Sequence, residues 1–263
     1  TNISISALEL SRGEYFPSHV LYIGTSNGKL YRLNNPRNAL NTQDPVDITP
    51  PSMVGYVSDI AVNPNNDEEV MVTVSNYSTS TTNVISVFWT NNAKSATPTW
   101  YSAEGNIPLP SFRSCMIVVK KDGSNNPVTE YYIGTSVGLY SAANIGTVLQ
   151  SNGTVNWVRE GGNVLNYAVI TSMDYRPQDN VLLVGTHGNG MYYSEIGSSD
   201  FRPNQNTAVI DPVRNDKNFI QTAYPTSVKD QLYYQTGNML TVKRISVQVH
   251  AINGQLVSRK ETG

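Results

Sequence analysis

The chain has 263 residues, a formal net charge of −2 and 14% charged residues. This length suffices for one large β domain and a small one. The low, balanced charge without a basic tract argues against a nucleic-acid partner, and no apolar run approaches the length of a membrane span. The single cysteine, Cys115, excludes an internal disulfide framework and a cysteine-based zinc site. It lies in an apolar run, which predicts a buried, inert thiol.

The predicted elements begin within a strand-like pattern and without a signal peptide, so we interpret the chain as a mature product or a fragment. Fifteen strands are expected up to residue 195, in four groups. They span 3–10, 20–25, 29–33 and 45–49; 56–62, 69–75, 83–90 and 97–102; 112–120, 128–135, 138–142 and 154–159; and 168–175, 180–186 and 190–195.

One short phrase recurs within these groups. It reads LYIGTSNGKLY at 21–31, YYIGTSVGLY at 131–140 and LLVGTHGNGMYY at 182–193. An apolar run, a Gly-Thr pair, a polar turn and an aromatic run predict a hairpin in each case. Gly24 and Gly134 are 110 residues apart, and Gly134 and Gly185 are 51 apart. A degenerate copy at 70–76 divides the larger gap if Thr73 takes the place of the glycine.

A repeat of this length with several short strands predicts the blades of a β-propeller. The expected fold is therefore all-β, with about four propeller blades over residues 1–200. Closed rings of four blades exist, but a larger ring of roughly six to eight blades, with further blades upstream, is the commoner architecture.

The C-terminal region changes character. Residues 201–217 are polar and unpatterned, which predicts a linker. Beyond it, residues 218–263 contain an alternating strand at 245–251, a turn at Asn253-Gly254 and a second strand at 255–259. Alternation closed by Asn-Gly is a strong hairpin signal, so we expect a small β-sandwich-like domain here.

Three stretches of the first region resemble sialidase-type propellers with Asp-box repeats: VSDIAVNP at 57–64, residues 89–100 and GTHGNG at 185–190. The Asp-box itself is degenerate. Its remnants are Thr90, Asn92 and Trp100 in the second group and Ser141, Asn144, Gly146 and Trp157 in the third. The resemblance implies that these residues tie the turn between third and fourth strands, a structural role rather than a catalytic one.

The tail resembles the C-terminal sorting domain of the type IX secretion system of Bacteroidetes. Tyr224 and Pro225 match its opening motif, and Asp230 and Gly254 are further candidate sorting-signal residues. Thr226 and Ser227 depart from the motif, and the final strand of the family is missing. The resemblance implies export to the medium or the outer-membrane surface of a Gram-negative bacterium, with the secretion shuttle or translocon as partner.

Catalytic candidates are few. A glycosidase needs two carboxyls about 5 to 10 Å apart, and Glu104 and Glu160 qualify by position, at neighbouring blade junctions. Asp59 begins an inner strand, where the resemblance implies a structural hydrogen-bonding role, with catalysis as the alternative. A sialidase needs three arginines around the sugar carboxylate; Arg113 and Arg159 supply two, and the third has no evident place.

Binding candidates lie in loops that face the ligand side of propellers. Asn27, His187 and Asn189 occupy turns between second and third strands, and Arg113 and Arg159 lie near the connections between blades. His187, between glycines, is a binding candidate or a simple turn residue. His19 and His250 lie far from it in the pattern, so no metal site is predicted, and no cofactor is expected.

Two functions stay open. The first is a secreted or cell-surface propeller module that binds a glycan or protein or acts as a scaffold. The second is a glycoside hydrolase of the sialidase-like or endoglucanase-like type, with part of its site outside this chain.

Overall fold

The computed structural model describes residues 2–12, 19–40, 42–75, 84–107, 110–122, 124–165 and 167–196, together with four C-terminal strands. The chain divides into two compact units, Thr1–Val209 and Ile210–Gly263. This division falls inside the segment 201–217 for which a linker is predicted. The second unit contains two hairpins, β16 (Ile220–Tyr224) with β17 (Tyr233–Thr236) and β18 (Ile245–His250) with β19 (Leu256–Thr262).

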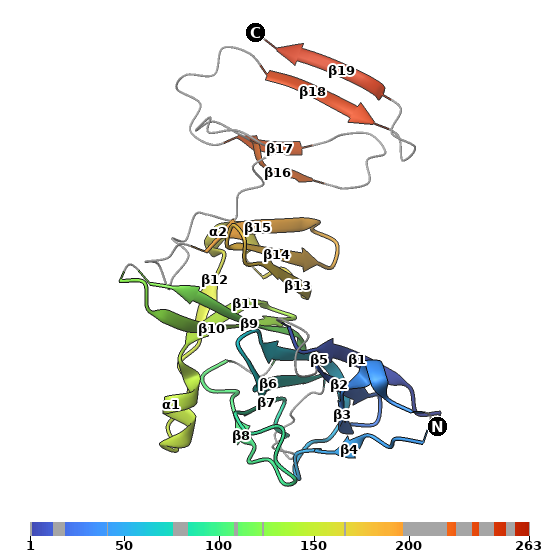
Figure 1. Cartoon of the computed structure of the whole chain (residues 1–263). Helices are drawn as coiled ribbons and strands as arrows, with labels where there is room; N and C mark the ends of the chain where they lie inside the picture. The colour runs from blue at the N-terminus through green and yellow to red at the C-terminus, as the bar shows by residue number, and fades with distance from the viewer. Residues whose placement is uncertain are drawn as a thin grey trace. The chain divides into compact units, whose positions relative to one another are not determined.

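The first unit consists of four antiparallel sheets whose strands pair in chain order (Figure 1). Sheet one contains β1 (Ile5–Leu10), β2 (Val20–Thr25), β3 (Leu30–Asn34) and β4 (Val46–Asp47). Sheet two contains β5 (Tyr56–Asn63), β6 (Asn66–Ser75), β7 (Val87–Thr90) and β8 (Tyr101–Ser102). Sheet three contains β9 (Phe112–Lys121), β10 (Pro127–Thr135), β11 (Gly138–Ala143) and β12 (Val158–Glu160). Sheet four contains β13 (Ile170–Arg176), β14 (Val181–Thr186) and β15 (Met191–Glu195).

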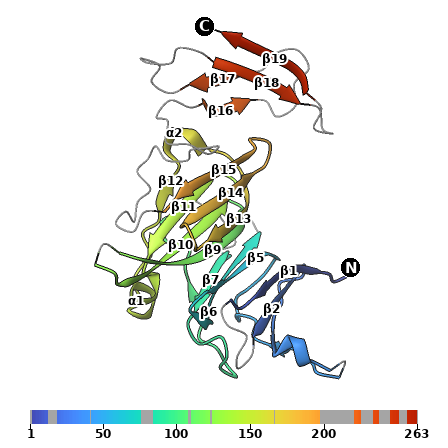
Figure 2. The ribbon, with the colours of Figure 1, turned by 45° about the horizontal axis from the view of Figure 1, so that its top comes forward.

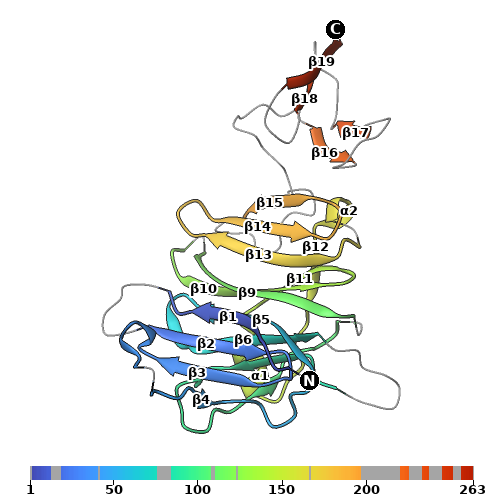
Figure 3. The ribbon, with the colours of Figure 1, turned by 90° about the vertical axis from the view of Figure 1, so that its right-hand side faces the viewer.

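This up-and-down order confirms the predicted fold class, an all-β chain built from propeller blades. We call the four sheets blades one to four. Their innermost strands, β1, β5, β9 and β13, contact one another in that order (Figures 2 and 3). Each blade therefore packs one face against the next blade along the chain. A second strand that lies between two neighbouring blades is accordingly apolar on both of its faces.

Three short helical segments were not predicted from the sequence: η1 (Pro36–Asn38), α1 (Ile145–Gln150) and α2 (Gly162–Leu165). In α1, Ile145 and Leu149 are buried one turn apart, which is the i, i+4 spacing of a helix face. Asn144 begins this helix in the left-handed conformation, with φ of 49°. Six residues give too few repeats of the period to reveal such a helix in a sequence.

The glycine of the repeated phrase occupies the same place in blades one, three and four. Gly24, Gly134 and Gly185 lie on the second strand, opposite a residue next to a bulge of the innermost strand. Thr73 has the same pairing with Asp59 in blade two. The register confirms that Thr73 is the counterpart of the glycines.

Close packing between blades requires two of these glycines. A Cβ atom at Gly24 would lie 2.4 Å from Cγ1 of Val57 in blade two. At Gly134 it would lie 2.7 Å from Cγ2 of Ile170 in blade four. In both cases a β-branched side chain of the next innermost strand fills the space above the glycine.

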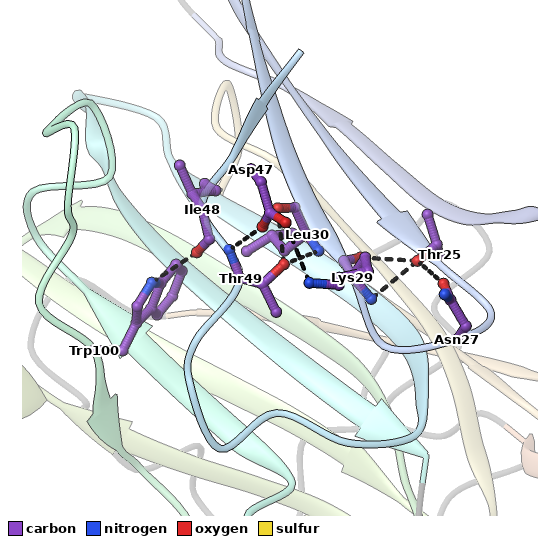
Figure 4. Close-up of polar contacts among 8 residues, drawn as sticks. All are labelled: Thr25, Asn27, Lys29, Leu30, Asp47, Ile48, Thr49 and Trp100. Carbon is purple, nitrogen blue, oxygen red and sulfur yellow. Dashed lines mark hydrogen bonds and ion pairs between the residues drawn. The ribbon is translucent and has the colours of Figure 1, made fainter.

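The threonine of the phrase closes the following turn. Thr135 Oγ1 donates to the carbonyl of Gly138 at 2.8 Å, and Thr186 Oγ1 donates to that of Gly190 at 2.6 Å. In blade one, Thr25 Oγ1 accepts a hydrogen bond from the Lys29 amide at 2.9 Å (Figure 4). The Gly-Thr pair thus combines a contact between blades with a hydrogen-bonded turn.

Candidate functional site

Most of the predicted site residues come to one edge of the blades. In an up-and-down sheet, the turn between strands two and three lies at the same edge as the connection to the next blade. We call this the turn edge. Seven predicted residues lie on or next to it: Asn27, Glu104, Arg113, Arg159, Glu160, His187 and Asn189.

The binding candidates on the turn edge differ in their exposure. Asn27, His187 and Asn189 are exposed at the tips of equivalent turns in blades one and four. Asn27 accepts a hydrogen bond from Thr25 Oγ1 at 2.7 Å, and the backbone amide of His187 donates to the carbonyl of Val169 at 2.8 Å. These contacts hold the turns in shape, and the imidazole of His187 lies at the surface.

The two arginines are half-buried. The guanidinium of Arg159 stacks over the ring of Tyr167, 3.9 Å from its centroid, a cation–π contact. Arg113 is the second residue of β9, the innermost strand of blade three. The guanidinium of Arg159 is therefore held against an aromatic ring beside the turn edge.

Glu104 and Glu160 each accept a hydrogen bond from their own blade. Glu104 Oε1 accepts from the Ser86 amide at 2.6 Å, and Glu160 Oε1 accepts from Ser141 Oγ at 2.5 Å. Burial raises the pKa of Glu104, and the bond from Ser86 partly offsets that rise. Glu160 is buried. The two carboxyls therefore serve separate hydrogen bonds that stabilise neighbouring blades.

Asp59 joins two blades. Its Oδ1 accepts from the Ile60 amide and its Oδ2 from the Cys115 amide of β9, both at 2.9 Å. Burial raises the pKa of Asp59 to about 6, against the lowering effect of these two bonds. The contact with β9 agrees with a structural role. Cys115 is buried, and burial raises the pKa of its thiol.

A second group of charged residues lies on or just after the innermost strands of blades one and four. Arg12, just after β1, lies with its Nη2 3.4 Å from Asp174 Oδ1 of β13 and with its Nε 3.8 Å from Glu9 Oε1. Arg12 Nη1 also donates to the carbonyl of Tyr175 at 3.4 Å. We call Glu9, Arg12 and Asp174 the axial cluster, since it links the innermost strands of blades one and four.

The pKa of Glu9 is raised to about 7. Burial is the main cause; Arg12 lowers the pKa, and the negative charges of Asp59 and Asp174 raise it. Glu9 and Asp174 occupy equivalent positions, opposite Tyr22 and Leu183 on their second strands. The alternation of β1 could have placed Glu9 on an inner strand, but nothing in the sequence indicated that Arg12 would reach blade four.

The Asp-box remnants form turns and contacts between blades. Asn92 Oδ1 accepts from Thr90 Oγ1 at 2.8 Å and from the Thr99 amide at 2.9 Å, which ties β7 to the segment before β8. Trp100 Nε1 donates to the carbonyl of Ile48 in blade one at 3.0 Å (Figure 4). Trp157 Nε1 donates to that of Ala103 in blade two at 2.8 Å. Each tryptophan thus hydrogen-bonds the preceding blade immediately after its last strand.

Among the described residues, no three histidine, cysteine, aspartate or glutamate side chains are grouped to hold a metal ion. Within the same residues, no helix has the length and apolar character to cross a bilayer. Of the sorting-signal candidates, Tyr224 ends β16, and Pro225, Asp230 and Gly254 lie outside the described residues.

No protein-family model matches the chain, and no curated protein matches it. Among solved structures, the chain is similar to the crystal structure of the Cps50 (Swd1) β-propeller domain of Myceliophteria thermophila. The two are 11% identical, the match covers 97% of this chain and 72% of that chain, and the TM-score is 0.48.

Proposed function

We propose that the chain is a non-catalytic propeller module of a secreted or cell-surface protein, which binds a glycan or a protein at its turn edge or spaces other domains. The observation that carries this proposal is that three candidate catalytic carboxyl groups are engaged in hydrogen bonds within the fold. Glu104, Glu160 and Asp59 accept hydrogen bonds from the scaffold. Three exposed side chains of the turn edge, those of Asn27, His187 and Asn189, are amides and an imidazole, which suit hydrogen bonding to hydroxyl or peptide groups.

Binding is tested by screening the purified chain on a glycan array and against a panel of cell-surface proteins. Replacing His187 and Asn189 with alanine should weaken a detected interaction at least tenfold. The matched control is Asn65→Ala, because Asn65 is an exposed asparagine in the turn between β5 and β6, at the opposite edge of the blades. Equal affinity of the turn variant and the wild type would remove the turn edge from the proposal.

We also propose that the protein is cargo of the type IX secretion machinery, on the resemblance of residues 218–263 to its sorting domain. The full chain, expressed in a Bacteroidetes host, should reach the medium or the cell surface. In a host without a functional translocon it should stay in the periplasm. Equal export from both hosts would contradict this assignment.

A glycoside hydrolase is the second candidate, and the raised pKa of Glu9 favours it. A carboxyl with a pKa near 7 is about half protonated at neutral pH and can serve as a general acid. Glu9 lies beside Arg12 and near a second carboxyl, Asp174. If this candidate is correct, chromogenic glycosides should be hydrolysed by the wild type and not by Glu9→Gln.

A further inference from the structure

In blades two, three and four, three positions of the innermost strand face the preceding blade. In blade two they hold Val57, Ile60 and Val62, all buried in a core shared with blade one. The pairing registers give the counterparts in the other blades. They are Phe112, Cys115 and Ile117 in blade three, and Ile170, Met173 and Tyr175 in blade four. These also pack in cores shared with the preceding blade.

Among the described residues, none covers the same three positions of blade one. Ile5, Leu8 and Leu10 are 62%, 56% and 44% exposed. By register, Leu8 lies opposite Ile23 and Leu10 opposite Leu21, both half-buried. We call these five residues the leading face of blade one. It has the pattern of a buried contact between blades, although no described residue packs on it.

Blade four shows the opposite half of such a contact. Leu183 and Gly185 on β14 are the counterparts of Tyr22 and Gly24, which are buried against blade two. Leu183 is 40% exposed, and Met191, opposite Gly185, is 65% exposed. A Cβ at Gly185 would closely approach only Ser172 of its own blade. The glycine thus leaves a space that no described residue of a following blade fills. We call Leu183, Gly185 and Met191 the trailing face.

The two faces match in chemistry and register. Gly24 receives Val57 and Gly134 receives Ile170, each the residue just before the bulge of the next innermost strand. Ile5 holds that position in blade one. The exposure of their side chains shows that the two faces do not meet within one molecule. Blades one and four contact each other near the axis, where Arg12 reaches Asp174.

We propose that the trailing face of one molecule binds the leading face of a second copy of this chain, with Ile5 of one copy in the space above Gly185 of the other. The contact repeats the one that joins blades one and two. Because it joins two different faces, two copies related by a two-fold axis form this contact twice, and the pair closes. The proposal does not depend on the function proposed above.

The first test is the mass of the full chain in solution by sedimentation velocity. We expect a species of about twice the 28.9 kDa of one chain. Leu8→Asp and Leu183→Asp each place a charge on one face and should shift the protein to the monomer, with at least a tenfold increase in the dissociation constant. Leu40→Asp is the matched control, since Leu40 is 74% exposed and lies on neither face. A monomeric wild type would overturn the proposal and leave the faces to blades of another polypeptide.

The second test is the pairing of the faces. A short bis-maleimide is added to Ile5→Cys, to Leu183→Cys, and to an equal mixture of the two. The native Cys115 is buried and should not react. Cross-linked dimer in the mixture, and not in either variant alone, is the expected result. Cross-linking of Ile5→Cys with itself would show that like faces meet and would overturn the contact between the leading and trailing faces.

Discussion

The glycine of the repeated phrase offers a sharp test of how the blades pack. In Gly24→Ala, the new methyl group would lie 2.4 Å from Cγ1 of Val57 and 2.9 Å from its Cβ. Carbon atoms in contact normally lie about 3.5–4.0 Å apart, so blade two must move by roughly 1 Å. Overpacking of this kind costs about 1–3 kcal/mol, and alanine returns about 0.4–1 kcal/mol by restricting the unfolded chain. We expect a net loss of about 1–2 kcal/mol.

The same substitution at Gly185 should have the opposite sign. The closest atom to its Cβ is Ser172 Oγ at 2.5 Å, a hydroxyl that can rotate away, and the next is 3.6 Å away. Gly185→Ala should therefore range from neutral to about 1 kcal/mol more stable. Urea unfolding followed by tryptophan fluorescence measures the free energy of unfolding of both variants, at a protein concentration where the chain is monomeric. Equal losses at Gly24 and Gly185 would refute the packing argument.

Three further predictions concern single groups. The pKa of Glu9 is raised from 4.5 to about 7. The contribution of this group to the free energy of unfolding is therefore fully present below pH 4.5 and is lost as the pH rises through 7. Across this range, the urea midpoint of Glu9→Gln should fall less steeply than that of the wild type. Lys120 and Glu130 form a buried ion pair, with Nζ and Oε2 3.0 Å apart. Lys120→Met leaves the carboxyl without its partner and should lower the free energy of unfolding by about 3–5 kcal/mol. Adding Glu130→Gln should restore part of this loss, and thermal unfolding measures both variants. Trp100→Phe removes the hydrogen bond to the carbonyl of Ile48 and should cost about 1 kcal/mol of unfolding free energy; no loss would show that the bond contributes nothing.

Much of the blade architecture could be predicted from the sequence because the strands carry strong local signals. Gly-Thr pairs, polar turns and apolar runs located strands within one to a few residues, for example 20–25 against the observed β2 (Val20–Thr25). The assignment of Thr73 to the place of a glycine was also correct, since it rested on a spacing that the register reproduces.

Contacts between distant segments could not be predicted in this way. The carboxyl of Glu69 accepts hydrogen bonds from Trp89 of its own blade and from the Tyr131 hydroxyl of blade three. No periodicity within one strand reports a partner on another blade. The axial cluster is similar, because the reach of Arg12 to Asp174 depends on how the blades are arranged around the axis. Helix α1 was missed because its six residues are too short to show a period.

The central functional claim is that the carboxyl groups of the turn edge stabilise the scaffold and do not catalyse hydrolysis. The most direct measurement is the hydrolysis of a panel of chromogenic glycosides by the wild type and by a Glu104→Gln, Glu160→Gln double variant, with the fold of each checked by circular dichroism. We predict no turnover above the uncatalysed rate in either protein and lower stability in the variant, because Ser86 and Ser141 lose a carboxylate acceptor. Turnover by the wild type that disappears in the folded variant would contradict the claim.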